Sequence, residues 1–222
     1  MSSMLGHVLG AQAVLGLASP LAPRSTRSHR AAWIVGIVAV LPELEALAYL
    51  LFGKPRWLEP QRDFSHSLFF AVVMGLVATL FLLKGVEHPD WQLGMSTACV
   101  LVLVALAHPF MEMFSKTWVS YPSTDVLGVP LFWPFAGGLV RGFARLLPDA
   151  YYSTAGLGEF FSRAFLFWRS LIAMVLEALV LVPLVVVAWK RPLPAVAFWA
   201  LGGVSAVGAL LCYLLYQSAG RL

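Results

Sequence analysis

Long apolar runs separated by short polar connections dominate this chain. The runs cover residues 4–18, 31–52, 65–83, 91–114, 164–189 and 194–216. A helix needs roughly 20 apolar residues to cross the hydrocarbon core of a membrane, and only the first run is clearly shorter. Because the runs are continuous rather than alternating, they predict helices and not the strands of a barrel.

The composition excludes a soluble globular domain. Of the 222 residues, 60% are hydrophobic and 12% are charged, whereas about a quarter are charged in soluble domains. The net charge of +4 arises from scarce acidic residues, and its cations lie in connections that can face anionic headgroups. The sequence has no cluster of basic residues of the kind that would indicate nucleic-acid binding. We therefore predict an all-α polytopic membrane protein with about six apolar helices, five or six of them spanning, whose partner is membrane lipid. The oligomeric state stays open.

The region from Ser115 to Ser162 interrupts the series of apolar runs. It is rich in proline, glycine and aromatic residues, so it cannot form one regular helix. We expect it to be a cap of loops and short helices on one membrane face, followed by two further transmembrane helices in residues 164–216. The first run has no basic residue before it, which favours a retained helix over a signal peptide. Residues 1–222 are thus expected to form a single membrane domain.

Ionisable side chains inside apolar runs are the main candidates for function, because each one costs a few kcal/mol unless it is paired or binds an ion. They are His7, Glu43, Glu45, Asp63, His66, His108, Glu112, Arg169 and Glu177. If consecutive helices alternate in direction, all except the last two fall toward one membrane face, the face of the expected cap. Chance convergence and ordinary interior hydrogen bonding are the competing explanations for individual histidines.

The residue types in this set are those of a metal site. His108 and Glu112 are spaced i and i+4, so they share a helical face and suit two ligands of one ion. Asp63 and His66 are three residues apart where the third run begins, close enough to share an ion. Pro42 can bend its helix, so Glu43 need not point away from a neighbouring acid.

Mixed imidazole and carboxylate ligation fits zinc best, with manganese or iron as alternatives. The donors exceed what a single tetrahedral ion requires, so one to three ions are expected. Glu45 is either a further ligand or a partner that orients a histidine.

The ordered motifs resemble those of the YdjM-type family of inner-membrane proteins, which are regarded as metal-dependent hydrolases. The resemblance rests on Gly6-His7, Leu41-Pro-Glu-Leu-Glu45, Arg62-Asp-Phe-Ser-His-Ser67, His108-Pro-Phe-Met-Glu112 and Gly128-Val-Pro-Leu-Phe-Trp-Pro134. It covers about residues 1–135 and implies a metal-site core there, in a bacterial inner membrane. The metal ligands that it implies are His7, Glu43, His66, His108 and Glu112.

The chain departs from the family pattern at five positions. Glu43, Glu45 and Glu112 stand where the family has aspartate, which keeps the charge and lengthens the side chain by one methylene. Gln61 replaces a family histidine and Asp63 replaces a family glycine. Either a ligand has moved by two positions or one metal has been lost.

The family's looser likeness to zinc-dependent phospholipase C and P1-type nucleases implies hydrolysis of a lipid or lipid-linked phosphoester by metal-activated water. Glu45 or Asp63 would then serve as a further ligand or as general base, and Arg62 and Lys116 could hold a phosphate. Two alternatives stay open. One is a zinc-dependent amidase resembling intramembrane ceramidases, and the other is a non-catalytic transporter coupled to ions or protons.

Overall fold

The structure, a computed structural model, describes residues 3–18, 23–43, 51, 64–84, 86–87, 89–113, 115–116, 129–135, 140, 147–148, 158, 162, 166, 168–190 and 193–219. Its α-helices are α1 (Met4–Ala18), α2 (His29–Val40), α4 (Leu68–Leu83), α5 (Trp91–Met113), α7 (Trp168–Trp189) and α8 (Ala195–Ala219). Short 3-10 turns are η2 (Arg24–Arg27), η3 (Leu41–Glu43) and η4 (Phe64–His66). Two-residue strands β1 (Ser115–Lys116) and β2 (Leu147–Pro148) pair in parallel.

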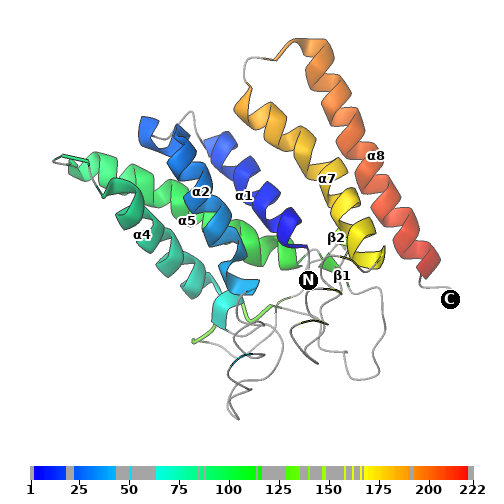
Figure 1. Ribbon diagram of the computed structural model, residues 1–222, viewed down its shortest axis with the longest axis horizontal. Coiled ribbons are helices and arrows are strands. Elements are labelled where there is room, and N and C mark those ends of the chain that lie inside the picture. Colours follow the sequence, from blue (N-terminus) through cyan, green and yellow to red (C-terminus); the bar gives the residue numbers. More distant parts are fainter. Residues whose placement is uncertain are drawn as a thin grey trace.

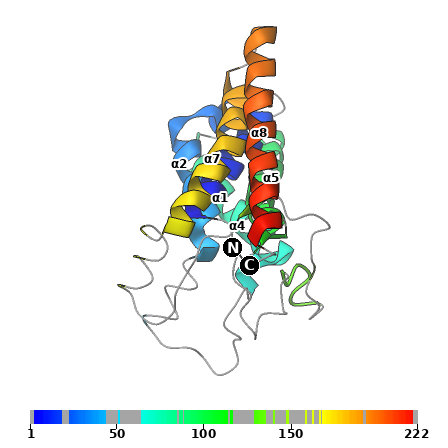
Figure 2. The ribbon, with the colours of Figure 1, turned by 90° about the vertical axis from the view of Figure 1, so that its right-hand side faces the viewer.

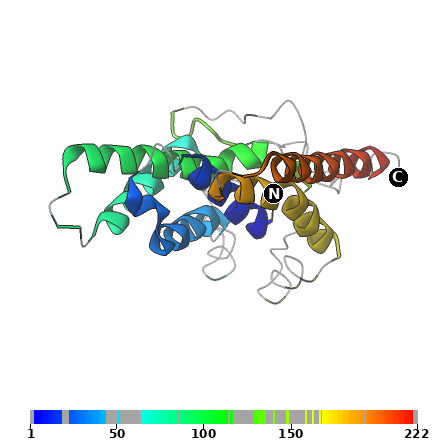
Figure 3. The ribbon, with the colours of Figure 1, turned by 90° about the horizontal axis from the view of Figure 1, so that it is seen from above.

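The helices run side by side with alternating direction (Figures 1 and 2). Helix α1 is central and packs against α2, α5 and α7, while α4 packs on α5 and α8 packs on α7. From above, α5 and α8 extend to opposite sides of the molecule (Figure 3). The apolar core lies between α1, α2, α4 and α5, with Leu15, Val35 and Leu101 fully buried. Alternation brings the starts of α1, α4 and α7 to the same end as the last turns of α2, α5 and α8.

Helix α2 is shorter than the apolar run predicted. The run extends over residues 31–52, but α2 ends at Val40 and η3 carries the chain through Glu43. The cause is Pro42, which has no N–H to continue the helical hydrogen bonds and whose ring disfavours the preceding helical turn. Glu43 therefore lies on a tight turn after the helix and not within its second half, as the apolar pattern had suggested.

Helix α4 begins later than expected for the same kind of local reason. Ser67 caps it, with its hydroxyl oxygen accepting a hydrogen bond from Phe70 N at 3.1 Å, as serine typically does at this position. His66 consequently lies in η4, just before the helix. At 16 residues, α4 is about 24 Å long, so the expectation that this run is long enough to span is not confirmed by the length of its helix.

The prediction of a helical membrane protein is confirmed. Three of the described helices are long and apolar enough to cross a membrane, namely Trp91–Met113, Ser170–Trp189 and Ala195–Cys212. Helices α1 and α4 are apolar but shorter, so three of the predicted five or six spans are supported by length.

Several ionisable side chains are buried inside the bundle, whereas many large apolar side chains face outward. Trp199, Val196 and Leu80 are among the large apolar side chains that are more than 70% exposed. Among the described residues, the histidine and acidic side chains that are at most 3% exposed are His7, Glu43, His66, His108, Glu112 and Glu177. Ionisable groups at membrane depth face the bundle interior because contact with lipid would leave them unpaired.

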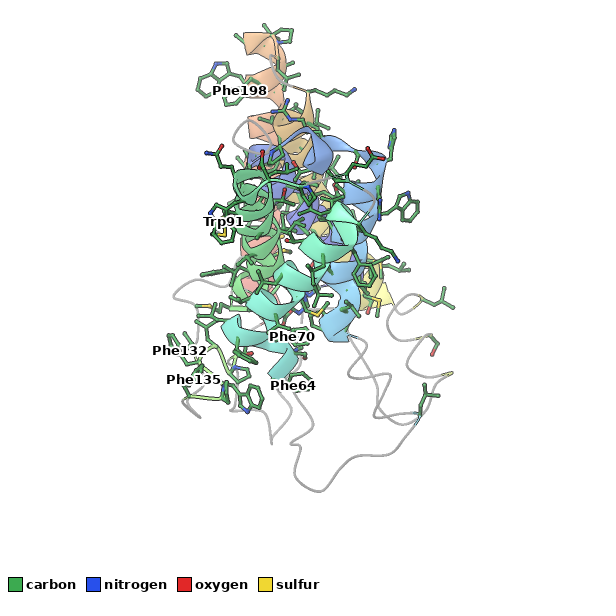
Figure 4. The ribbon with its side chains drawn as sticks, turned by 90° about the vertical axis from the view of Figure 1, so that its left-hand side faces the viewer. Phe64, Phe70, Trp91, Phe132, Phe135 and Phe198 are labelled. Atoms are coloured by element: carbon green, nitrogen blue, oxygen red, sulfur yellow. The ribbon has the colours of Figure 1, made fainter. Side chains whose placement is uncertain are left out.

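Residues 129–135 of the expected cap lie against the start of α4, whereas β2 contacts α7 and α8. Leu131 O accepts a hydrogen bond from Leu68 N at 2.9 Å, and the ring of Trp133 lies 5.6 Å from that of Phe64. In Figure 4, Phe64, Phe132 and Phe135 lie at the end of the bundle opposite Phe198. Most of residues 115–162 are not among those that the structure describes.

Candidate metal centre

The centre is built around His7 on α1, which lies between two carboxylates. Its Nε2 atom is 3.1 Å from Glu43 Oε1 and 3.1 Å from Glu112 Oε1, and these side chains are fully buried. The three residues come from α1, η3 and α5, so segments distant in sequence meet at one imidazole. An uncompensated carboxylate would be very costly at such a place, and His7 offsets the charge only in its protonated form.

Two further histidines complete the cluster. The ring of His108 stacks on that of His7, with centroids 3.9 Å apart and an interplanar angle of 22°. The ring of His66 lies 4.8 Å from that of His108, and Ser65 Oγ is 3.0 Å from His66 Nδ1. Three imidazoles and two carboxylates from α1, η3, η4 and α5 thus share one buried volume.

The orientation of His108 is set by the end of α2. His108 Nδ1 lies 3.0 Å from the carbonyl oxygen of Ala39, in the last helical turn, where carbonyls lack helical partners. Because a carbonyl oxygen only accepts, Nδ1 carries the proton and Nε2 keeps its lone pair. A backbone carbonyl on the far nitrogen is a common way of orienting a metal-binding histidine.

These residues fit a divalent metal ion. One ligand atom from each of His7, Glu43 and His108 can be chosen so that all lie within 4.8 Å of one another. Among the described residues, neither Glu43 Oε2 nor His108 Nε2 has a hydrogen-bond partner, although both atoms are buried. Imidazole nitrogen and carboxylate oxygen are ligands of zinc, manganese and iron alike, so the donor set indicates a cation without identifying it.

The remaining predicted site residues cannot be placed. Glu45, Arg62 and Asp63 lie outside the described residues, as does Gln61. Lys116 is described by its backbone alone, in β1. Their suggested roles therefore stay predictions.

Glu177 is a buried acid near the centre to which the sequence pattern assigned no role. It lies on α7, is completely buried, and accepts hydrogen bonds from Ser3 at the start of α1. The signal in the sequence was a lone carboxylate in an apolar run. Its partner Ser3 is 174 positions away. Rules based on local spacing cannot identify a contact between residues so far apart.

Fold and site together define a class, the polytopic helical membrane proteins with a buried histidine and glutamate centre at one end of the bundle. Within that class the chain belongs to the YdjM inner membrane protein family, whose family model matches residues 1–217. No curated protein and no solved structure matches the chain. Its family membership and its three membrane-capable helices identify the protein as an integral inner-membrane protein.

The extent of the family match corrects one sequence-based expectation. The motifs on which the resemblance rests cover only about residues 1–135. The match instead continues through α7 and over most of α8. Contact between α1 and α7 gives a structural reason for treating these helices as part of the same unit as the centre.

Proposed function

We propose that this protein is a metal-dependent hydrolase of the inner membrane that cleaves a lipid or lipid-linked phosphoester. The observation that carries the proposal is the buried centre, in which His108 is held by Ala39 O with its Nε2 atom lacking a hydrogen-bond partner among the described residues. The nearby Glu43 is equally buried. Such groups are expensive in a membrane interior and are retained where they bind an ion or act chemically.

The proposed ligands are the five clustered residues, His7, Glu43, His66, His108 and Glu112. Zinc is the preferred ion and one to three ions are proposed, with manganese or iron as alternatives. A bound ion of this kind polarises a phosphoryl oxygen and generates a nucleophile from water at neutral pH. Membership of the YdjM family and the donor set support this assignment.

The chain's own residues would supply the other parts of the reaction. We assign Glu45 or Asp63 as general base or further ligand, since Glu45 is two residues from Glu43 and Asp63 is three residues from His66. Arg62 and Lys116 are proposed to hold the phosphate, for which a guanidinium offers a planar pair of donors. These four assignments rest on the positions of the residues in the sequence alone.

A lipid substrate is supported by an apolar groove beside the centre. The groove lies between α1 and α2 and has a volume of about 580 Å³, within the range of ligand sites. Val8 and Leu41 are among its lining residues. Val8 directly follows His7 in the chain, and Leu41 directly precedes Pro42-Glu43. Trp33 and Ile37, which are 76% and 60% exposed, line it where it faces the outer surface of the bundle.

Metal content of the purified protein is the decisive test. We expect at least one tightly bound ion in the wild type and a substantial loss in His108→Ala, measured by elemental analysis after dialysis. Thr97→Ala is the matched control, because Thr97 is also buried on α5 but lies three helical turns from His108. Equal metal in the wild type and His108→Ala would contradict the proposal.

Stoichiometry and substrate separate the competing functions. Two or three ions with chelator-sensitive hydrolysis of phosphatidylglycerol would support phosphoester chemistry. One zinc with hydrolysis of an N-acyl lipid amide, and none of the phospholipid, would favour the amidase. Absence of metal from the wild type would favour the transporter.

A further inference from the structure

Glu177 is a fully buried carboxylate on α7 whose partner is the start of α1. Its Oε1 and Oε2 atoms accept hydrogen bonds from Ser3 N at 2.9 and 3.2 Å, and Oε2 also accepts one from the Ser3 hydroxyl. Donors from both the backbone and the side chain of one residue thus compensate a charge that would otherwise be costly to bury. The contact ties two helices together at one point.

Ser3 also contacts the backbone of Gly6 and His7. Its hydroxyl oxygen accepts a hydrogen bond from Gly6 N at 3.0 Å, which is the usual geometry of a helix N-cap. Its carbonyl oxygen accepts another from His7 N at 3.0 Å. The backbone of His7 is therefore held by Ser3, and Ser3 is held by Glu177.

Gly6 brings Glu177 directly against the backbone beside His7. A Cβ atom at this position would lie 2.5 Å from Glu177 Oε2 and 2.6 Å from Glu177 Cδ, closer than real side chains approach. In the Gly6-His7 pair, Gly6 thus leaves space for the Glu177 carboxylate, and the His7 side chain lies in the centre.

We infer that Glu177 is a positioning residue for the metal centre, which fixes His7 between Glu43 and Glu112 by holding Ser3 and packing on Gly6. It acts through α1 and is not a ligand. The metal readout of this inference rests on the proposed function, whereas the position of His7 can be measured without any metal. The inference also explains why α7 belongs to the same functional unit as the four segments of the centre.

The first experiment compares Glu177→Gln with Trp189→Phe in the full-length protein. Trp189 Nε1 donates a hydrogen bond to Gln12 O at 3.0 Å. Trp189→Phe therefore also removes a bond between α7 and α1, but about one and a half helical turns beyond His7. Each protein is titrated with Co²⁺ and followed by its visible absorption. We expect Glu177→Gln to weaken Co²⁺ binding by about 10- to 100-fold, as is usual when a group that orients a ligand is lost, and to shift the spectrum. Trp189→Phe should leave both unchanged.

The second experiment needs no metal. The apo proteins are treated with diethylpyrocarbonate, and modification of His7 is quantified in its peptide by mass spectrometry. His7 is 1% exposed, so it should react slowly in the wild type and in Trp189→Phe, and faster in Glu177→Gln. Ser3→Ala keeps the carboxylate but removes the hydroxyl link, and should change both readouts in the same direction by less. It also keeps the test decisive if Glu177→Gln does not fold.

The two failures are distinguishable. If the wild type takes up no Co²⁺, the proposed function fails, and His7 reactivity alone decides the positioning role. If the wild type binds Co²⁺ but Glu177→Gln and Ser3→Ala match Trp189→Phe in both readouts, the positioning role is overturned and the metal centre stands.

Discussion

His108 donates its Nδ1 proton to the carbonyl oxygen of Ala39, 3.0 Å away. One hydrogen bond thereby joins the end of α2 to α5 and selects the tautomer whose Nε2 lone pair lies in the centre. Ala39 is three residues before Pro42, which ends the helix. Pro42 therefore also influences the orientation of the His108 and Glu43 side chains in the centre.

Pro42→Ala tests this dependence. Alanine restores an N–H and allows α2 to continue toward Glu43, which turns the carboxylate away from His7. We expect helicity by circular dichroism to be retained or to rise, while metal affinity by calorimetry falls at least tenfold. Unchanged affinity would mean that η3 is not needed to place Glu43.

The charge of Glu43 should matter more than its length. Glu43→Gln preserves the shape of the side chain but removes the negative charge 3.1 Å from His7 Nε2, and we expect metal to be lost. Glu43→Asp keeps the charge and shortens the side chain by one methylene, so binding should be weakened less. Elemental analysis of the two variants side by side gives the comparison, and an equal loss in both would show that reach rather than charge is decisive.

Gly6→Ala should be destabilising because its methyl group would collide with Glu177. Overpacking of this kind costs about 1–3 kcal/mol. The double variant Gly6→Ala with Glu177→Ala should lose less stability than the sum of the losses in the two single variants. The second change removes the carboxylate with which the new methyl group would collide. Thermal unfolding in detergent measures all three, and strict additivity would argue against the contact.

Gly75 and Gly94 form a matched pair for helix packing. A Cβ at Gly75 would lie 2.6 Å from Val102 Cα and 2.7 Å from Val102 N, whereas one at Gly94 meets nothing within 4 Å. Small residues of the first kind let membrane helices approach closely. Gly75→Ala should therefore lower the unfolding temperature, and Gly94→Ala should leave it unchanged or raise it slightly. Similar shifts in both would be evidence against close packing of α4 on α5.

Metal should stabilise the folded protein through the same centre. A ligand present at 100 times its dissociation constant adds about 2.7 kcal/mol to folding stability. We expect ZnCl₂ to raise the unfolding temperature of the wild type and of Thr97→Ala, but not that of His108→Ala. A shift of equal size in His108→Ala would assign the effect to binding elsewhere.

The sequence predicted the membrane class and the meeting of several segments better than it predicted helix boundaries. Alternating helices send polar residues near one face to the same end of the bundle, and His7, His66 and His108 do lie together. The end of α2 was misplaced because the apolar run continues past Pro42, and apolar character does not distinguish a helix from a turn. Glu177 was left without a role because its contact depends on how α7 packs on α1. That packing is a property of the assembled bundle and not of any local pattern.

The bond between Ser3 and Glu177 also has a consequence for biogenesis. The two residues are 174 positions apart, so α1 leaves the ribosome long before α7 does. Until α7 has been inserted, the segment that carries His7 has no anchor at its beginning. If the centre binds metal as proposed, metal binding would follow the insertion of α7, and a nascent chain arrested before α7 would lack the contact that fixes His7.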